Sequence, residues 1–294
     1  MADFDNGISI IIPVYNAEKY ISECMDSLFN QSFKKSLEYI FVLDKNSSDS
    51  SEEILANETK DIPNVKILKP KDGSGAGYNR NMAFEHVSKD YIGFCDADDW
   101  VDTDFYERLY DYSQIYNADI AIGCTSLIDE QRQAEFNKID FPFSVEYTPG
   151  KVFQKLYWNT VWDKIYRATL VKENKEVRFA EGIIHEDNIF LINAVYKANK
   201  VITVPGSYYY WRRYPGSASM IPTDSAKYRN DAYIAFNECL DSLEKMELPV
   251  IEKVHIIKQL MSWATEGFKS GKSANNYLKD RIQKIAGMNF TETD

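Results

Sequence analysis

Short apolar runs alternate with amphipathic stretches along the first hundred residues. Residues 8–14 form a nearly continuous apolar run that predicts a buried strand. Residues 17–30 place apolar side chains on one helical face, with Asn16 as the expected N-cap. The remaining elements expected in this part are strands over 39–43, 65–68 and 91–95 and helices over 49–55 and 81–87. This alternation predicts an α/β fold with a mostly parallel central sheet flanked by helices.

The second part of the chain has a less regular pattern. We expect a helix over 103–119, a strand over 120–122 and a polar loop over 129–138. Helical and aromatic segments are expected over 152–170, and a 3.6-residue rhythm after about residue 224 predicts a helical end. The resulting division is a first domain, 1–220, with halves 1–100 and 101–220, followed by a helical C-terminal extension, 221–294.

Composition narrows the classes of protein. The chain has 294 residues and a formal net charge of −11, which disfavours nonspecific nucleic-acid binding. Its four cysteines show no CxxC or disulfide-framework spacing, so reduced thiols are expected. The polar N-terminus does not read as a secretory signal, and the apolar runs are too short to cross a bilayer. A cytoplasmic location is the expectation from these features.

The residues that follow the predicted strands carry the candidate chemistry, because ligands of such sheets bind beyond the carboxyl ends of strands. Asp96, Asp98 and Asp99 lie together after the fourth strand. Asp96 and Asp98 can face one point, where Mn²⁺ or Mg²⁺ would bridge them to a diphosphate. An EF-hand is excluded because Trp100 and Val101 stand where a ligand and a glycine are needed. The simpler alternative is an acidic turn that caps the next helix.

Several motifs occur in order over about residues 7–220. After the opening strand and helix come Gly75-Ala76-Gly77-Tyr78-Asn79-Arg80-Asn81 and Asp96-Ala97-Asp98-Asp99-Trp100. Later motifs are Trp162-Asp163-Lys164, His185-Glu186-Asp187 and Tyr210-Trp211-Arg212-Arg213-Tyr214-Pro215-Gly216-Ser217. In this ordered set the chain resembles family 2 of the inverting glycosyltransferases, which have the GT-A fold. It departs from the family's usual pattern at Asp44-Lys45-Asn46 and at Asp163.

The resemblance implies a role for each candidate residue. Asp187 is the expected general base, and Glu186 binds the acceptor or supports the base; the alternative is that both acids cap a helix that begins near residue 188. Asp98 and Asp96 are the expected metal ligands, and Asn81 is expected to act as a cap. The residues expected to bind the donor are Pro13, Tyr15, Asp44, Arg80, Asp96, Ala97, Arg212 and Arg213. The alternatives are a half-buried aromatic for Tyr15, an ordinary turn residue for Asp44 and a salt-bridged helix residue for Arg80. For Arg212 and Arg213 the alternative is a solvated surface pair.

The function that the resemblance implies is transfer of a sugar, with inversion, from a nucleotide-diphosphate sugar such as a UDP-sugar to an acceptor hydroxyl. The acceptor would be a carbohydrate, glycolipid or glycoprotein, as in polysaccharide synthesis. The alternatives are a sugar-nucleotide nucleotidyltransferase, which would want a basic phosphate loop near the N-terminus, and a non-catalytic carbohydrate-binding scaffold. The basic, amphipathic tail predicts a helical hairpin packed on the catalytic domain or on a second copy, as in a homodimer. Its alternative is peripheral contact with the inner face of a membrane, using Trp263 and Phe268.

Overall fold

Strand β1 (Asp5–Val14) lies at the centre of the first half of the sheet. It pairs in parallel with β2 (Leu37–Leu43) on one side and with β4 (Lys89–Phe94) on the other. Strand β3 (Val65–Leu68) pairs in parallel with β2 and ends this side of the sheet. The apolar run in β1 is buried because both of its faces are covered, as is usual in parallel sheets. The four strands expected in this part are therefore confirmed. The computed structural model describes residues 4–33, 36–132, 134–147, 151–152, 160–264 and 279–285.

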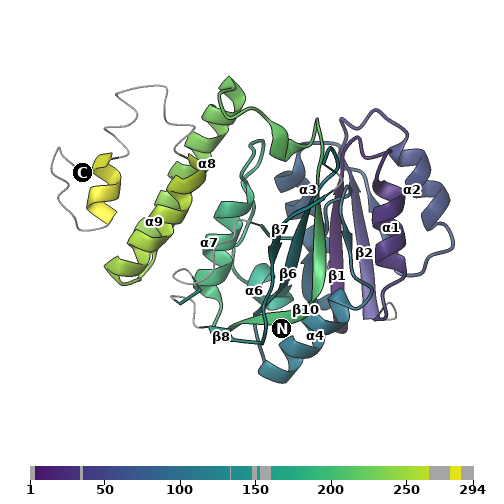
Figure 1. The fold of residues 1–294 in the computed structure, drawn as a ribbon, viewed down its shortest axis with the longest axis horizontal. Coiled ribbons are helices and arrows are strands. Elements are labelled where there is room, and N and C mark those ends of the chain that lie inside the picture. The colour runs from purple at the N-terminus through teal and green to yellow at the C-terminus, as the bar shows by residue number, and fades with distance from the viewer. Residues whose placement is uncertain are drawn as a thin grey trace.

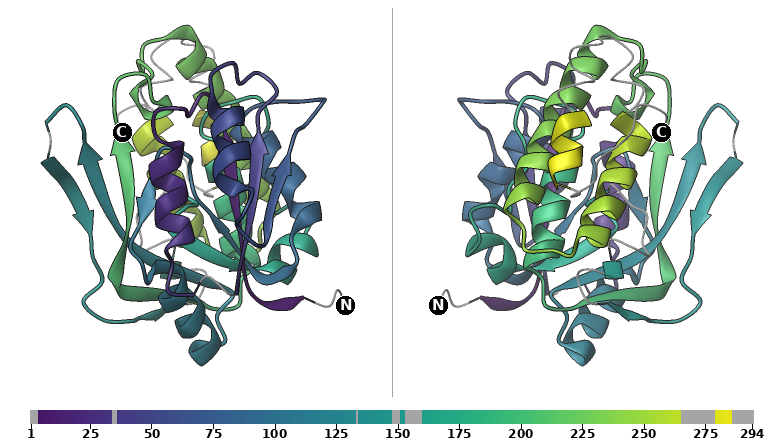
Figure 2. Two further views of the ribbon diagram at one scale, coloured as in Figure 1. Left: turned by 90° about the vertical axis from the view of Figure 1, so that its right-hand side faces the viewer. Right: turned by 90° about the vertical axis from the view of Figure 1, so that its left-hand side faces the viewer.

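The connecting helices begin at different residues from those expected. Helix α1 (Ile21–Phe29) follows Tyr20, so Asn16 is not its N-cap. Asn16 has a φ of 46°, a left-handed conformation that a short polar side chain tolerates, and its Oδ1 accepts a hydrogen bond from the Ser48 N–H at 2.8 Å. Helix α3 (Ala76–Ala83) begins inside the glycine motif, five residues before the expected start, and continues into a 3-10 turn, η2 (Phe84–His86). Helix α2 (Ser51–Thr59) lies beside α1 at one end of the molecule (Figures 1 and 2).

Strand β9 (Lys164–Arg167) joins the two halves of the ten-stranded sheet, because it pairs antiparallel with β4 on one side and with β6 (Ile120–Asp129) on the other. Strand β10 (Val201–Arg213), which the sequence pattern did not predict, runs parallel to β6. The strand order is β3-β2-β1-β4-β9-β6-β10-β5. The other elements of this half are β5 (Trp100–Val101), α4 (Phe105–Tyr116), β7 (Ala134–Ile139), β8 (Glu146–Tyr147), α6 (Ala168–Lys172), α7 (Asp187–Lys197) and η3 (Ala218–Met220).

Two expectations for this half are corrected. The loop expected over 129–138 is wrong, because β7 pairs antiparallel with β6 and carries the chain back along the sheet edge. The segment 152–170 is only partly helical: it contains β9 and the start of α6, and residues 153–159 lie outside the described part of the chain. In both places tertiary pairing in the sheet outweighs the local polar or helical pattern.

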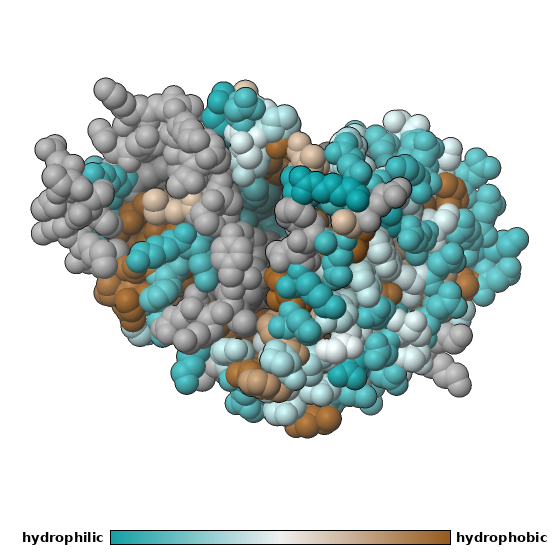
Figure 3. Space-filling view, in the orientation of Figure 1, coloured by the Kyte–Doolittle hydropathy of each residue, from teal (hydrophilic) through white to brown (hydrophobic). Residues whose placement is uncertain are grey.

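The helical end expected after residue 224 is confirmed by α8 (Ala226–Lys245) and α9 (Val250–Ala264). Helix α8 packs on α7 and buries an apolar stripe that includes Phe236, Leu240 and Leu243 (Figure 1). Apolar side chains gather over this extension in Figure 3, and Val250 and Ile251 of α9 are exposed. Within the described residues, no helix has the length and apolar character needed to cross a membrane. Phe268 and the side chain of Trp263 lie outside the described part, and the membrane and homodimer readings of the tail stay predictions.

Candidate active site

Arg80 is the centre of a cluster of acids that come from both halves of the sheet. It lies on α3 with a side chain only 3% exposed, and its Nη2 donates to Asp96 Oδ1 at 2.7 Å. Its Nη1 donates to Glu186 Oε1 at 2.7 Å and to Asp187 Oδ1 at 3.1 Å. Burial alone would lower the pKa of the guanidinium, but the charges of Asp187, Asp96 and Glu186 raise it. The structure thus brings together four residues that were predicted from separate motifs.

The position of Arg80 depends on close packing of α3 against the segment before α7. A Cβ atom on Gly77 would lie 2.0 Å from the carbonyl oxygen of Ala180, so the helix can approach this closely only with glycine there. Asn81 does not cap a helix, as was expected, but lies within α3. Its Nδ2 donates to the Phe179 carbonyl at 3.0 Å and its Oδ1 accepts from the Phe179 N–H at 2.9 Å. These contacts fix Arg80 relative to the second acidic motif.

Glu186 and Asp187 lie at the start of α7 and direct their carboxylates to Arg80. Glu186 occupies the N-cap position of this helix, but its side chain makes no capping hydrogen bond there. The alternative that both acids serve only as caps therefore has no support in the geometry. Burial raises the pKa of Asp187, and the charges of Glu186 and Asp96 act in the same direction while Arg80 and Lys164 oppose them. A carboxylate with a raised pKa is suited to accept a proton near neutral pH.

Asp99 anchors the acidic turn that follows β4. Its Oδ2 accepts from the Tyr209 hydroxyl at 2.7 Å and its Oδ1 accepts from the Arg212 N–H at 2.7 Å. The Tyr209 hydroxyl also accepts from the Asp96 N–H at 3.0 Å, so one phenol holds both ends of the turn. Motif reasoning missed Tyr209. The signal that could have found it is the apolar run at 201–204 leading into Tyr208–Arg213, which together form β10.

Asp98 is the member of the turn with the chemistry of a metal ligand. Burial and the charge of Asp96 raise its pKa to about 6, so this carboxylate lacks a cationic partner strong enough to offset both effects. Among the described residues, no three His, Cys, Asp or Glu side chains form a metal-binding group. Mg²⁺ and Mn²⁺ are commonly held by one or two carboxylates with substrate phosphates completing the shell. The pair Asp96 and Asp98 fits a cation of that kind.

The residues expected to meet the nucleotide lie after β1 and β2. Asp44 is buried, and its Oδ2 accepts from the Gly75 N–H at 2.6 Å and from Asn79 Nδ2 at 2.9 Å. Asp44 therefore organises the glycine motif as well as bordering the site. Tyr15 is 60% exposed, which leaves its ring open for stacking on a base. Pro13 lies in β1 opposite Val42, and Ala97 is buried in the acidic turn.

The two arginines at the end of β10 lie in different surroundings. Arg212 is buried; it donates to Glu130 Oε1 at 2.9 Å, to Glu23 Oε2 at 2.5 Å and to the Asp98 carbonyl at 2.8 Å. Its charge is thus paired with acids, and it ties the acidic turn to α1 rather than forming a solvated surface pair with its neighbour. Arg213 is partly exposed, and its Nε lies 2.9 Å from the sulfur of Met220.

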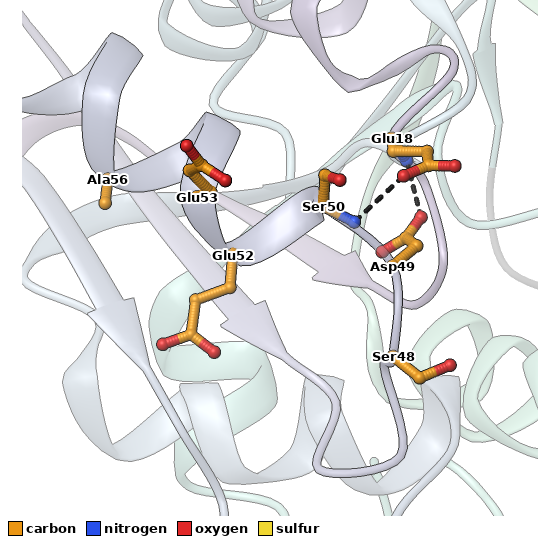
Figure 4. A pocket seen from close by; sticks show the side chains of 7 residues that line it. All are labelled: Glu18, Ser48, Asp49, Ser50, Glu52, Glu53 and Ala56. Atoms are coloured by element: carbon orange, nitrogen blue, oxygen red, sulfur yellow. Dashed lines mark hydrogen bonds between the residues drawn. The ribbon is translucent and has the colours of Figure 1, made fainter.

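An open pocket of about 870 Å³ at the start of α2 is chemically different from this cluster (Figure 4). Asp49 Oδ2 accepts from the Glu18 N–H at 2.8 Å, and Glu18 Oε2 accepts from the Ser50 N–H at 2.9 Å. The wall of this pocket contains carboxylates and no lysine or arginine, so it offers no positive charge to a diphosphate. The residues that line the pocket are Glu18, Ser48, Asp49, Ser50, Glu52, Glu53 and Ala56.

Comparison with known proteins places the chain in a family. A family model described as Glycosyl transferase family 2 matches residues 9–174. The chain is 32% identical over 260 residues to a poly(ribitol-phosphate) beta-glucosyltransferase of Bacillus spizizenii, covering 85% of this chain and 39% of that protein. It is 29% identical over 268 residues to the glycosyltransferase GlyA of Streptococcus pneumoniae, covering 87% of this chain and 37% of that protein. The chain therefore spans less than two fifths of the length of these relatives.

A solved structure shares the fold. The structure of residues 1–349 of TarS from S. aureus, in complex with UDP-GlcNAc, superposes with a TM-score of 0.75 at 22% sequence identity. The match covers 95% of this chain and 81% of that one. The expected GT-A architecture with C-terminal helices is confirmed by this likeness.

Proposed function

The chain belongs to glycosyl transferase family 2, and from that premise we propose that it transfers a sugar from a nucleotide-diphosphate sugar to an acceptor hydroxyl. The observation that carries the proposal is the position of Arg80 between Asp96, which follows β4, and the pair Glu186 and Asp187 at the start of α7. In this arrangement Asp96, a proposed metal ligand, and Asp187, the candidate base, both contact the buried guanidinium of Arg80. A scaffold that only bound sugars would have no need for three acids around it.

Asp187 is the proposed general base, which accepts the proton of the acceptor hydroxyl as that oxygen attacks the anomeric carbon. Burial and the neighbouring acids raise the pKa of this carboxylate, which makes it a stronger base, while the charges of Arg80 and Lys164 oppose that rise. Glu186 is proposed to orient the acceptor or support the base. A single displacement of this kind inverts the anomeric carbon, so an α-linked donor would give a β-linked product.

On the donor side, Tyr15 is proposed to stack on the base and Asp44 to border it, with Pro13, Ala97 and Arg213 lining the donor and Arg212 holding the acidic turn. Asp98 and Asp96 would hold Mn²⁺ or Mg²⁺. That cation, when bound, stabilises the charge that develops on the departing diphosphate. The electrostatic reason for a cation is clear from the acids themselves: Asp96, Asp98, Glu186 and Asp187 outnumber the one guanidinium that contacts three of them.

We propose a UDP-sugar with a glucosyl or N-acetylglucosaminyl group as the donor and a ribitol-phosphate polymer as the acceptor. The support is the activity for which the Bacillus relative is named and the ligand of the TarS structure.

The proposal is tested by incubating the full chain with UDP-glucose or UDP-GlcNAc, Mn²⁺ and a ribitol-phosphate oligomer, and measuring released UDP and the product anomer by NMR. We expect acceptor-dependent UDP release and a β linkage. Release of pyrophosphate from UTP and a sugar 1-phosphate, with no sugar transfer, would instead identify a nucleotidyltransferase. An α linkage from the same donors would contradict single displacement.

A further inference from the structure

The turn that precedes the acid pair is held in an uncommon conformation. His185 has a φ of 66°, in the left-handed region that few residues other than glycine adopt. Such a conformation is strained for a residue with a Cβ atom and persists only where neighbouring groups hold it. His185 lies directly before Glu186 and Asp187, so any relaxation of the turn would move both carboxylates relative to Arg80.

Contacts from helix α8 hold this turn. Asp231 Oδ2 accepts a hydrogen bond from the Ile184 N–H at 3.1 Å, and the His185 ring packs edge-on against Tyr228 with 5.0 Å between centroids. Residues 228 and 231 are three apart and therefore lie on the same face of the helix. The helix that supplies them lies beyond residues 9–174, the part of the chain that carries the family match.

The burial of Asp231 is hard to explain by packing alone. Its side chain is only 6% exposed although it lies on a helix face that is otherwise apolar. A buried carboxylate is costly unless it accepts hydrogen bonds. Asp231 receives them from Ile184 N–H, from Lys227 Nζ at 2.6 Å and from Asn230 Nδ2 at 3.3 Å. Of these donors, Ile184 lies outside α8, so the bond to its N–H connects the carboxylate to the turn.

We propose that Asp231 is a positioning residue for sugar transfer: through the Ile184 N–H it fixes the turn that aims Glu186 and Asp187 at Arg80. The inference rests on the proposed role of Asp187. In this proposal helix α8 of the C-terminal extension contributes to catalysis, because Asp231 on α8 sets the position of the base Asp187 on α7. Loss of the bond would leave the donor site intact and misplace the base.

The test is the steady-state rate of UDP release by Asp231→Ala in the full chain, with UDP-GlcNAc or UDP-glucose as donor, Mn²⁺, and the ribitol-phosphate oligomer as acceptor. Because a displacement of about 1 Å at a catalytic group can cost up to 10²-fold, we expect kcat to fall roughly 10-fold or more. The KM for the donor and the calorimetric affinity for UDP with Mn²⁺ should stay within about twofold, since Asp231 contacts none of the residues proposed to bind the donor. Hydrogen exchange at the Ile184 amide should become faster.

Conservative and matched variants separate positioning from stability. Asp231→Asn keeps an oxygen that can accept from Ile184 N–H, so it should retain most of kcat. Lys227→Met removes the other close partner of Asp231 and should leave kcat unchanged. Asp241→Ala, on the same helix, removes the 2.6 Å contact to Arg281 and controls for loosening of the extension. Should Asp231→Ala fail to fold, Asp231→Leu replaces it, because leucine restores apolar packing without restoring the bond.

The outcomes distinguish this inference from the proposed function. Wild-type kcat in Asp231→Ala, while Asp187→Asn is inactive, would overturn the positioning role alone. The same holds if Asp241→Ala lowers kcat as much as Asp231→Ala for an equal fall in Tm. Wild-type turnover in Asp187→Asn would instead remove the base assignment on which the inference rests.

Discussion

The acids on the two sides of Arg80 are held in place in different ways. Asp96 and Asp98 belong to a turn that directly follows β4, and Asp99 of the same turn is anchored on β10 through Tyr209 and Arg212 N–H. Glu186 and Asp187 begin a helix, and their turn is held by residues on α3 and α8. The first arrangement lies between two strands of the sheet, β4 and β5, and is hydrogen-bonded to a third, β10, whereas the second depends on helices α3 and α8 that pack beside it. We therefore expect the acid pair to be easier to displace than the acidic turn.

Arg80→Met is expected to have the largest effect, because Arg80 contacts both groups of acids and no other residue in the described part of the chain is shown to do so. Removing one partner from a buried ion pair costs about 3–5 kcal/mol, and a loss of about 4 kcal/mol in the transition state is roughly 10³-fold in rate. Both Tm and kcat/KM should fall. Arg80→Lys should recover little, since an ammonium cannot reproduce the forked contacts of a guanidinium. Near-normal activity in Arg80→Lys would show that the two groups do not need a shared guanidinium.

Asp187→Asn should lower kcat by roughly 10²-fold or more, the usual contribution of a general base. The amide preserves the shape of the side chain, so calorimetric binding of UDP with Mn²⁺ should not change. Glu186→Gln serves as the neighbouring control and should lose less. Equal losses in the two variants would mean that the base cannot be assigned to Asp187.

Asp98→Ala should remove the Mn²⁺ dependence of UDP binding without changing the fold. In the wild type the same binding should weaken about fivefold from pH 6 to pH 5. The reason is that the pKa of Asp98 is raised to about 6, so below that pH the cation must displace a proton. Calorimetry across this range measures both effects. Exposed Asp72 provides the control, because Asp72→Ala should keep the wild-type dependence.

Gly77→Ala tests the packing on which the acid pair depends. The added Cβ would overlap the Ala180 carbonyl, so α3 and the following segment must separate, at a cost of about 1–3 kcal/mol. We expect a lower Tm and a lower kcat, with a smaller change in Mn²⁺-dependent UDP binding. A change confined to UDP binding would reverse the comparison between the two groups.

The smallest expected effect concerns pH and the turn at His185. Burial lowers the pKa of this imidazole to about 4, so between pH 6.5 and 4 the unfolded chain takes up a proton that the native chain does not. The stability that this residue contributes is present above pH 6.5 and is lost as the pH falls through that window. His185→Asn, which tolerates the left-handed conformation, should therefore lose about 2 kcal/mol less stability than the wild type between pH 7 and pH 5. Parallel Tm curves for the two proteins would contradict this.

The difference between strands with a local apolar pattern and contacts between distant segments explains how much could be predicted from the sequence. The apolar runs gave the strands of the first half, with 65–68 matching β3 at both ends, because buried parallel strands show their pattern locally. Residues after those strands then identified Asp44 and the acidic turn. Strand β10 was missed because Pro205 and Gly206, a pair that usually marks a turn, interrupt its apolar run. The links through Asn81, Tyr209 and Asp231 could not be predicted, since each joins segments about 50 to 110 residues apart.

The shared contacts of Arg80 also constrain how this chain can change over evolutionary time. Because three carboxylates depend on one guanidinium, the effect of replacing any of them depends on whether the other two are present. In a variant that has lost Asp96, Arg80 is paired with Glu186 and Asp187 alone. The effect of then losing either of these acids differs from its effect in the unaltered chain. Divergence of the acidic turn and divergence of the pair Glu186 and Asp187 are therefore not independent histories. Under the proposed function, a new sugar or a new acceptor would be reached most readily by substitutions outside these four residues, because such substitutions leave the ion-paired cluster unchanged.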